Sequence, residues 1–178
     1  MILGQLVARI LYNVVKSFTL RHIIPDCLAD RVEKFRTLLL VASGARIGSN
    51  SVVRHSVMIK IPKNLVIGEN VKIGEGARFY NFSEVMIGDN VEIGPGLHVY
   101  TDEHIIDDNQ KPFAKQGSRT SEIHIGSDCY LGSRVTILSG VTITDRCVVA
   151  AGSVVVRNLE TSGVYAGVPA VLKRDFKV

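Results

Sequence analysis

The chain has 178 residues, 46% of them apolar and 21% charged, which is the composition of a globular domain with a substantial core. Tryptophan is absent, so the core must be built mainly from Val, Ile, Leu and Ala. The net charge is +4, and no basic stripe carries interleaved aromatic residues, so a nucleic-acid partner is not expected.

Residues 1–40 are predicted to form a helical segment ahead of the main domain. Apolar residues recur at helical spacing from Ile2 to Phe18, and a second helix is expected over residues 29–40. Two interpretations of the first helix stay open. The favoured one is that it caps the end of the domain that follows or packs within an oligomer. The other is a peripheral membrane contact through residues 1–25, which contain three basic residues and no acid.

Neither a signal peptide nor a transmembrane helix is predicted. Arg9 and Lys16 interrupt the apolar stretch, no small-residue cleavage site follows it, and no run reaches about 18 apolar residues. The three cysteines have no metal-ligand spacing. These features favour a cytoplasmic protein, located at the inner face of the membrane if the first helix binds lipid.

A repeat of six residues begins near residue 41 and governs the rest of the chain. Each unit has an aliphatic residue followed by a small one, as in Ile67-Gly68, Ile73-Gly74, Ile87-Gly88, Ile93-Gly94, Ile125-Gly126 and Leu131-Gly132. This period suits short strands joined by tight corners, three to a triangular coil. Stacked coils form three parallel sheets, so we predict a mainly β fold: a parallel β-helix over residues 41–161 with a C-terminal tail at 162–178.

Residues 100–122 interrupt the repeat with a polar and charged sequence. A segment this long without its own repeat is usually functional or disordered. We expect a loop extruded from one corner of the coils.

Five short motifs stand in a fixed order along the repeat. They are YNF at 80–82, TDEH at 101–104, LGS at 131–133, AAGS at 150–153 and AGVPA at 166–170. With this set the chain resembles the hexapeptide-repeat acetyltransferases, among them the maltose and galactoside enzymes and those of exopolysaccharide or capsule biosynthesis. The resemblance covers about residues 41–175. It implies a left-handed β-helix, a homotrimer with active sites between subunits, acetyl-CoA as the acetyl donor and no metal.

The resemblance gives the role of general base to His104, which begins the extruded loop directly after a coil. An imidazole that titrates near neutral pH can remove the hydroxyl proton as the acceptor oxygen attacks the thioester carbon. The competing interpretation is a solvated loop histidine.

Three residues are candidates for contacts with the acceptor. The resemblance implies Asn81, whose amide can donate to one hydroxyl group and accept from another. Tyr80 would line the same pocket, and Glu84 is the carboxylate nearest to the place of the family's acidic contact. For Asn81 the alternative is a polar residue at a coil corner.

The coenzyme contacts are expected along one edge of the coils. Ser133 and Ala151 are one coil apart, and the resemblance places such residues beside the pantetheine arm. The C-terminal signature, formed by Gly167, Val168 and Pro169, would lie near the adenine. Because Val171 stands where the family usually has a basic residue, Lys173 and Arg174 are the candidates for the coenzyme phosphates.

The sequence therefore predicts an acetyl-CoA-dependent O-acetyltransferase acting on a hydroxyl of a sugar or glycan precursor, either small or lipid-linked. Alternatives within the enzyme class are a serine O-acetyltransferase and a nucleotide-sugar N-acetyltransferase. A γ-carbonic-anhydrase-like metal enzyme would use His98, His104 and His124 as ligands. A non-catalytic β-helix is the remaining alternative.

Overall fold

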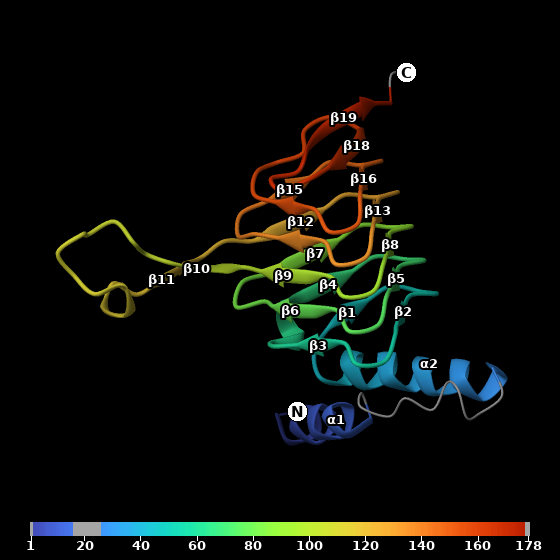
Figure 1. Ribbon diagram of the computed structural model, residues 1–178. Coiled ribbons are helices and arrows are strands. Elements are labelled where there is room, and N and C mark those ends of the chain that lie inside the picture. The colour runs from blue at the N-terminus through green and yellow to red at the C-terminus, as the bar shows by residue number, and fades with distance from the viewer. Residues whose placement is uncertain (1, 16–25, 177–178) are drawn as a thin grey trace.

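The protein is described by a computed structural model that covers residues 2–15 and 26–176. Two helices, α1 (Ile2–Val15) and α2 (Asp26–Ala42), lie at one end of a three-sided prism of stacked coils (Figure 1). Lys16, Phe18 and Arg21, which the sequence analysis included in the N-terminal helix or its basic charge, lie outside the described residues. In the described chain, no helix is both long and apolar enough to cross a bilayer.

Three sheets of short strands form the sides of the prism. The strands pair in parallel from coil to coil, except for the last strand of sheet B, which is antiparallel to its neighbour. Sheet A contains β1 (Arg46–Ile47), β4 (Leu65–Ile67), β7 (Val85–Ile87), β12 (Ile123–Ile125) and β15 (Thr142–Ile143). Sheet B contains β2 (Val52–Val53), β5 (Lys72–Ile73), β8 (Glu92–Ile93), β13 (Tyr130–Leu131), β16 (Val148–Val149), β18 (Gly163–Ala166) and β19 (Val171–Asp175). Sheet C contains β3 (Met58–Ile59), β6 (Arg78–Tyr80), β9 (His98–Tyr100), β14 (Thr136–Ile137) and β17 (Val154–Val155).

The six-residue repeat accounts for this architecture. In each strand the aliphatic residue points inward, so that Ile67, Ile87 and Ile125 stack in register and are almost completely buried. Burial of these side chains supplies the main driving force for folding. The predicted β-helix of hexapeptide repeats is confirmed, and the stacked parallel coils are consistent with the expected left-handed form.

The corners are tight because small or left-handed residues occupy them. A Cβ atom added to Gly132 would lie 2.5 Å from the backbone nitrogen of Ala151 on the next coil, closer than real contacts allow. Asn70 and Asn90 adopt φ values of +56°, a conformation that asparagine tolerates better than most residues. Their side-chain amides form a hydrogen bond of 3.2 Å from one coil to the next. The corner residues thus fix the spacing between coils.

The two helices close the first coil. Leu39 and Leu40 of α2 are buried in the core, and the Tyr12 hydroxyl of α1 donates to the Val57 carbonyl oxygen at 2.8 Å. Burial raises the pKa of this phenol, which keeps it a neutral donor. The structure therefore shows the capping role that the sequence favoured, and α2 extends beyond the predicted residues 29–40 at both ends.

Residues 162–175 also belong to the prism. β18 pairs in parallel with β16, and β19 turns back to pair with β18 in antiparallel fashion. Residues 162–175, which the sequence analysis assigned to a tail, thus extend sheet B and cover its outer end (Figure 1).

Candidate active site

His104 lies on an arm that projects from the corner between sheets C and A (Figure 1). Two strands, β10 (Asp102–His104) and β11 (Ser118–Thr120), pair in antiparallel fashion, with His104 opposite Ser118. The predicted loop is therefore a hairpin at its base. His104 is exposed and ends β10, so its imidazole is available to a substrate.

Thr101 fixes the base of the arm, three residues before His104. Its side chain is completely buried, and its hydroxyl donates to the Tyr80 carbonyl oxygen at 3.2 Å. The same hydroxyl oxygen accepts a hydrogen bond from the Ser83 backbone N–H at 3.0 Å. The Thr101 carbonyl oxygen accepts from the Ser139 hydroxyl and from the Ser121 N–H, so both ends of the arm are tied to the coils.

We expect Thr101→Val to lower both stability and kcat. Valine has the same shape but can neither donate to Tyr80 nor accept from Ser83, and such a loss costs about 1–3 kcal/mol. Thermal unfolding and steady-state kinetics measure the two effects. Thr120→Val, an exposed change on β11, is the control and should behave like the wild type.

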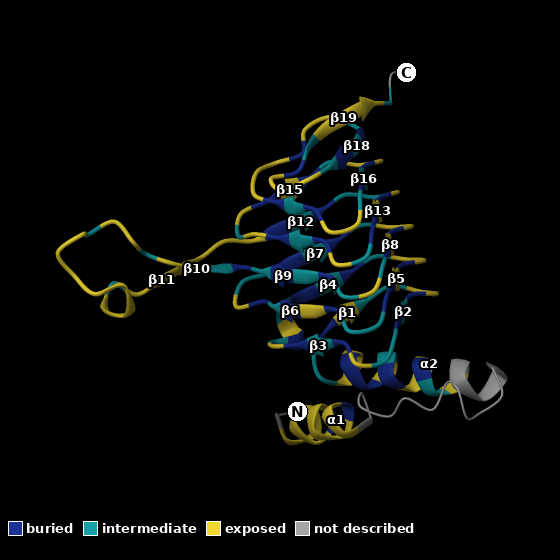
Figure 2. Ribbon diagram, viewed as in Figure 1, coloured by how far each residue is buried: buried dark blue, intermediate teal, exposed yellow. Residues whose placement is uncertain are grey.

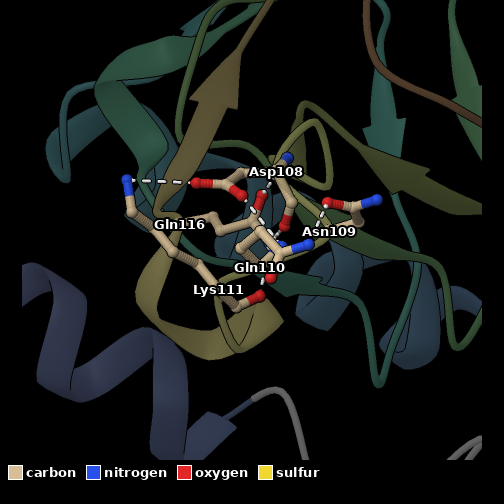
Figure 3. Close-up of polar contacts among 5 residues, drawn as sticks. All are labelled: Asp108, Asn109, Gln110, Lys111 and Gln116. Atoms are coloured by element: carbon tan, nitrogen blue, oxygen red, sulfur yellow. Dashed lines mark hydrogen bonds and ion pairs between the residues drawn. The ribbon is translucent and has the colours of Figure 1, made fainter.

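The tip of the arm is held by Gln116 (Figure 3). Its side-chain NH2 donates to the carbonyl oxygens of Asp108 at 2.7 Å and Lys111 at 2.9 Å, and its side-chain oxygen accepts from the Asp108 N–H at 3.0 Å. An ion pair of 3.2 Å joins Lys111 to Asp108. At the base, Arg119 donates to Glu103 at 2.6 Å across the hairpin. These contacts make the arm an ordered element that can carry a functional side chain.

A groove of about 580 Å³ runs along a different corner, between sheets B and C. It is lined by Glu75, Pro95, Gly96, Ser133, Arg134, Ala151 and Gly152. The Gly152 N–H donates to the Ser133 carbonyl oxygen at 2.9 Å, which stacks the two coils directly. The structure therefore brings together Ser133 and Ala151, the two predicted contacts of the pantetheine arm.

The C-terminal signature continues the same corner. The Gly167 N–H donates to the Ser153 hydroxyl at 3.1 Å, and the Gly167 carbonyl oxygen accepts from the Val154 N–H at 3.1 Å. Val168 and Pro169 are exposed beside this contact. Gly167, Val168 and Pro169 thus lie one coil beyond Ala151, in line with the groove.

Lys173 and Arg174, the residues predicted to bind the coenzyme phosphates, lie on β19, which leaves the groove corner. β19 runs away from the corner, so that Val171 pairs with Ala166 near it while Arg174 pairs with Val164 farther along. The Arg174 guanidinium lies 5.2 Å from the centre of the Phe176 ring. Arg174 is therefore remote from the groove corner, and Lys173 lies between the two positions.

Sequence reasoning missed the charged residues that line the groove and the hollow next to it. Arg134 and Glu75 lie in the groove itself. A second hollow of about 180 Å³, which shares Ser133 with the groove, contains Arg54, Lys72 and Glu92. The sequence did indicate Arg134 in one respect, because it directly follows Ser133. In the structure Arg134 occupies a corner with a φ of +57°. Arg54 and Lys72 come from other coils, so only stacking shows that they are neighbours.

The three predicted acceptor residues do not form one pocket. Asn81 is completely buried, and its amide bonds the Ile61 backbone in both directions, at 2.7 and 3.0 Å. An acceptor cannot contact the buried Asn81 side chain. Asn81 instead stabilises the corner of a coil, which was the alternative interpretation of this residue. Glu84 forms an ion pair with Arg46 on sheet A. Tyr80 lies on sheet C, where its ring stacks on that of Tyr100 at 4.9 Å with an angle of 3° between the planes.

The comparisons with known proteins agree with the fold. The family described as hexapeptide repeat of succinyl-transferase matches residues 122–157. The putative colanic acid biosynthesis acetyltransferase WcaF of Escherichia coli K12 is 34% identical over 142 residues, which cover 80% of this chain and 75% of that protein. The chain belongs to the hexapeptide-repeat acetyltransferases.

Solved structures of other acetyltransferases align with this acetyltransferase over almost its whole length. The hexapeptide-repeat acetyltransferase VCA0836 of Vibrio cholerae, solved with acetyl-CoA, is 27% identical with a TM-score of 0.77, over 97% of this chain and 88% of that one. A galactoside acetyltransferase solved with CoA is 28% identical with a TM-score of 0.77, over 98% and 83%. These alignments therefore extend into the N-terminal helical segment, beyond residues 41–175.

The three histidines of the carbonic-anhydrase alternative do not converge within this acetyltransferase. His98 lies on sheet C with its ring edge toward Tyr100, His124 lies on sheet A 3.5 Å from Glu122, and His104 is on the arm. Among the described residues, no group of three His, Cys, Asp or Glu side chains could hold a metal ion.

Proposed function

We propose that this acetyltransferase transfers an acetyl group from acetyl-CoA to a hydroxyl of a sugar or glycan precursor. The observation that carries the proposal is the corner groove, in which Ser133 and Ala151 leave room beside the backbone and Arg134 supplies a positive charge. The names of the relatives support the acyl donor and a polysaccharide pathway.

His104 is the proposed general base. Its imidazole takes the proton from the acceptor hydroxyl while that oxygen attacks the thioester carbonyl carbon. The carbon–sulfur bond then breaks, and the coenzyme thiolate leaves and receives the proton from the imidazolium. The net products are the acetyl ester and CoA.

The site requires two copies of the chain. β9 leads from the groove corner at Gly96 to the base of the arm at Thr101, so sheet C separates His104 from the groove within one chain. A neighbouring subunit would bring its arm to the groove, which supports the homotrimer implied by the family resemblance. Closure by a neighbour would also exclude water from the thioester.

The acceptor would bind where the arm meets the outer face of sheet C. The half-buried rings of Tyr80 and Tyr100 lie there, on the strands that lead toward the arm. A small sugar or a lipid-linked glycan precursor is the proposed acceptor, and the cytoplasm, where acetyl-CoA is available, is the proposed location.

The experiment is a thiol-release assay with acetyl-CoA against sugars, nucleotide sugars and serine, with mass spectrometry of each product. Release with a sugar hydroxyl supports the proposal. Acetylation of serine or of an amino sugar would replace it with one of the two enzyme alternatives. Absence of both CoA binding and thiol release would favour a non-catalytic β-helix.

A further inference from the structure

The first helix turns its apolar side away from the protein. Four aliphatic side chains lie along one side of α1 at helical spacing, and 49–74% of each is exposed: Leu3, Val7, Ile10 and Val14. The buried side is formed by Ala8 and Tyr12 instead, and Tyr12 bonds to the first coil. Capping therefore uses the less apolar side of the helix and leaves the strongly apolar stripe uncovered. Such a stripe usually marks a surface that binds something.

The second helix presents a similar stripe at the same end of the prism. Phe35, Leu38 and Val41 are exposed, whereas Leu39 and Leu40 are buried against the first coil. α1 and α2 contact each other, and both lie beyond the first coil (Figures 1 and 2). Both helices thus expose apolar side chains at this end of the molecule.

The charges around this surface are basic. Among the described side chains of the two helices and of residues 60–64, the exposed charged ones are Arg9, Arg31, Lys34, Lys60 and Lys63. Among the described side chains up to residue 64, the one acid, Glu33, is buried. Residues 1–64 contain ten basic and three acidic residues, whereas the rest of the chain contains eleven and fourteen. Along the sequence, positive charge is thus concentrated in the segment that contains the two helices and the first coil.

A hollow of about 250 Å³ lies where α1 meets the 3-10 turn. Arg9 and Lys63 supply its charge, and Leu6, Ile61 and Pro62 supply apolar walls. The Arg9 guanidinium is held there by a 2.8 Å hydrogen bond to the Lys60 carbonyl oxygen. Cations beside apolar walls suit a lipid phosphate and the first carbons of its chains.

We propose that α1 and α2 bind the surface of a bilayer that contains anionic phospholipids. The apolar stripes enter the boundary between headgroups and acyl chains, and the basic side chains contact the phosphates. With 14 residues, α1 is about 21 Å long, shorter than the roughly 30 Å hydrocarbon core, so it lies in the plane of the surface. The stacked coils then extend away from the membrane surface. This proposal does not depend on the acetyltransferase mechanism.

The test is sedimentation of the full chain with vesicles of phosphatidylcholine alone or with about one third phosphatidylglycerol. The protein should sediment with the mixed vesicles and much less with the neutral ones. The variant Leu3→Gln/Val7→Gln/Ile10→Gln removes exposed apolar side chains and keeps good helix formers in α1. We expect it to bind the mixed vesicles at least about tenfold more weakly, since three apolar contacts with lipid are lost.

Two controls make the result specific. Ile106→Gln/Phe113→Gln changes equally exposed apolar residues on the arm and should leave vesicle binding unchanged. Arg9→Gln/Lys63→Gln should weaken binding to the mixed vesicles only, whereas Lys111→Gln/Lys115→Gln on the arm should have much less effect. A wild-type chain that stays in solution with mixed vesicles, or a triple variant that sediments like it, would overturn the proposal. If the triple variant instead changes the subunit number measured without lipid, the surface is an interface between copies and the proposal also fails.

Discussion

Replacement of His104 with alanine is expected to lower kcat by at least about a hundredfold, the usual contribution of a general base. The KM for acetyl-CoA should change little, because the coenzyme groove lies at another corner and is formed by Ser133, Arg134 and Ala151. His104 has no structural partner whose loss would unfold the arm; its backbone pairing with Ser118 does not require the imidazole. Thiol release at saturating acceptor measures the effect.

His124→Ala is the matched control. This imidazole is half-buried on sheet A, 3.5 Å from Glu122, and takes no part in the proposed chemistry. Its loss should leave kcat within about twofold of the wild type. Equal losses in both variants would argue for a role shared by the histidines, and an unchanged rate in His104→Ala would remove His104 from the mechanism.

Filling the groove is expected to weaken coenzyme binding. Ala151 is exposed at a corner where small side chains leave about 580 Å³ of open space. A tryptophan at this position occupies the volume that the pantetheine arm requires, so Ala151→Trp should raise the Kd for CoA at least about tenfold, which is about 1.4 kcal/mol. Titration calorimetry with CoA measures this without any acceptor.

Ser49→Trp provides the comparison for this change. Ser49 is also small and exposed, but it lies at the corner between sheets A and B, away from the groove. CoA binding should be unaffected, and both variants should unfold near the wild-type temperature. If Ala151→Trp bound CoA with wild-type affinity, the coenzyme would have to be placed elsewhere on the surface.

Asn81 shows why the role of a polar residue is hard to assign from its motif alone. The motif YNF suggested an amide open to the acceptor, yet both of its polar atoms are bonded to the Ile61 backbone. Asn81 and Ile61 are 20 residues apart, one coil in this part of the chain, and a buried amide must find such partners or destabilise the fold. The register that brings them together exists only after the coils have stacked.

The N-terminal helix gives a second example. Its apolar periodicity predicted the helix correctly, but amphipathic patterning alone would have buried the stripe that contains Leu3 and Ile10. Packing instead selected the side with Tyr12, because its hydroxyl reaches the Val57 carbonyl oxygen of the first coil. The sequence therefore indicated an amphipathic helix without indicating which side would face the protein.

The sequence by itself determined the coiled architecture, because a six-residue period with an inward aliphatic residue and a small neighbour is satisfied by short strands and tight corners. It also determined which residues stack, since Ser133 and Ala151 follow directly from a spacing of one coil. Only the tertiary structure decided which charges line the groove, and that the arm and the groove of one chain lie at different corners. The physical reason is that the repeat spacing determines which residues of successive coils lie above one another. The direction of a side chain and the path of a non-repeating segment depend instead on contacts between parts of the chain that are distant in sequence.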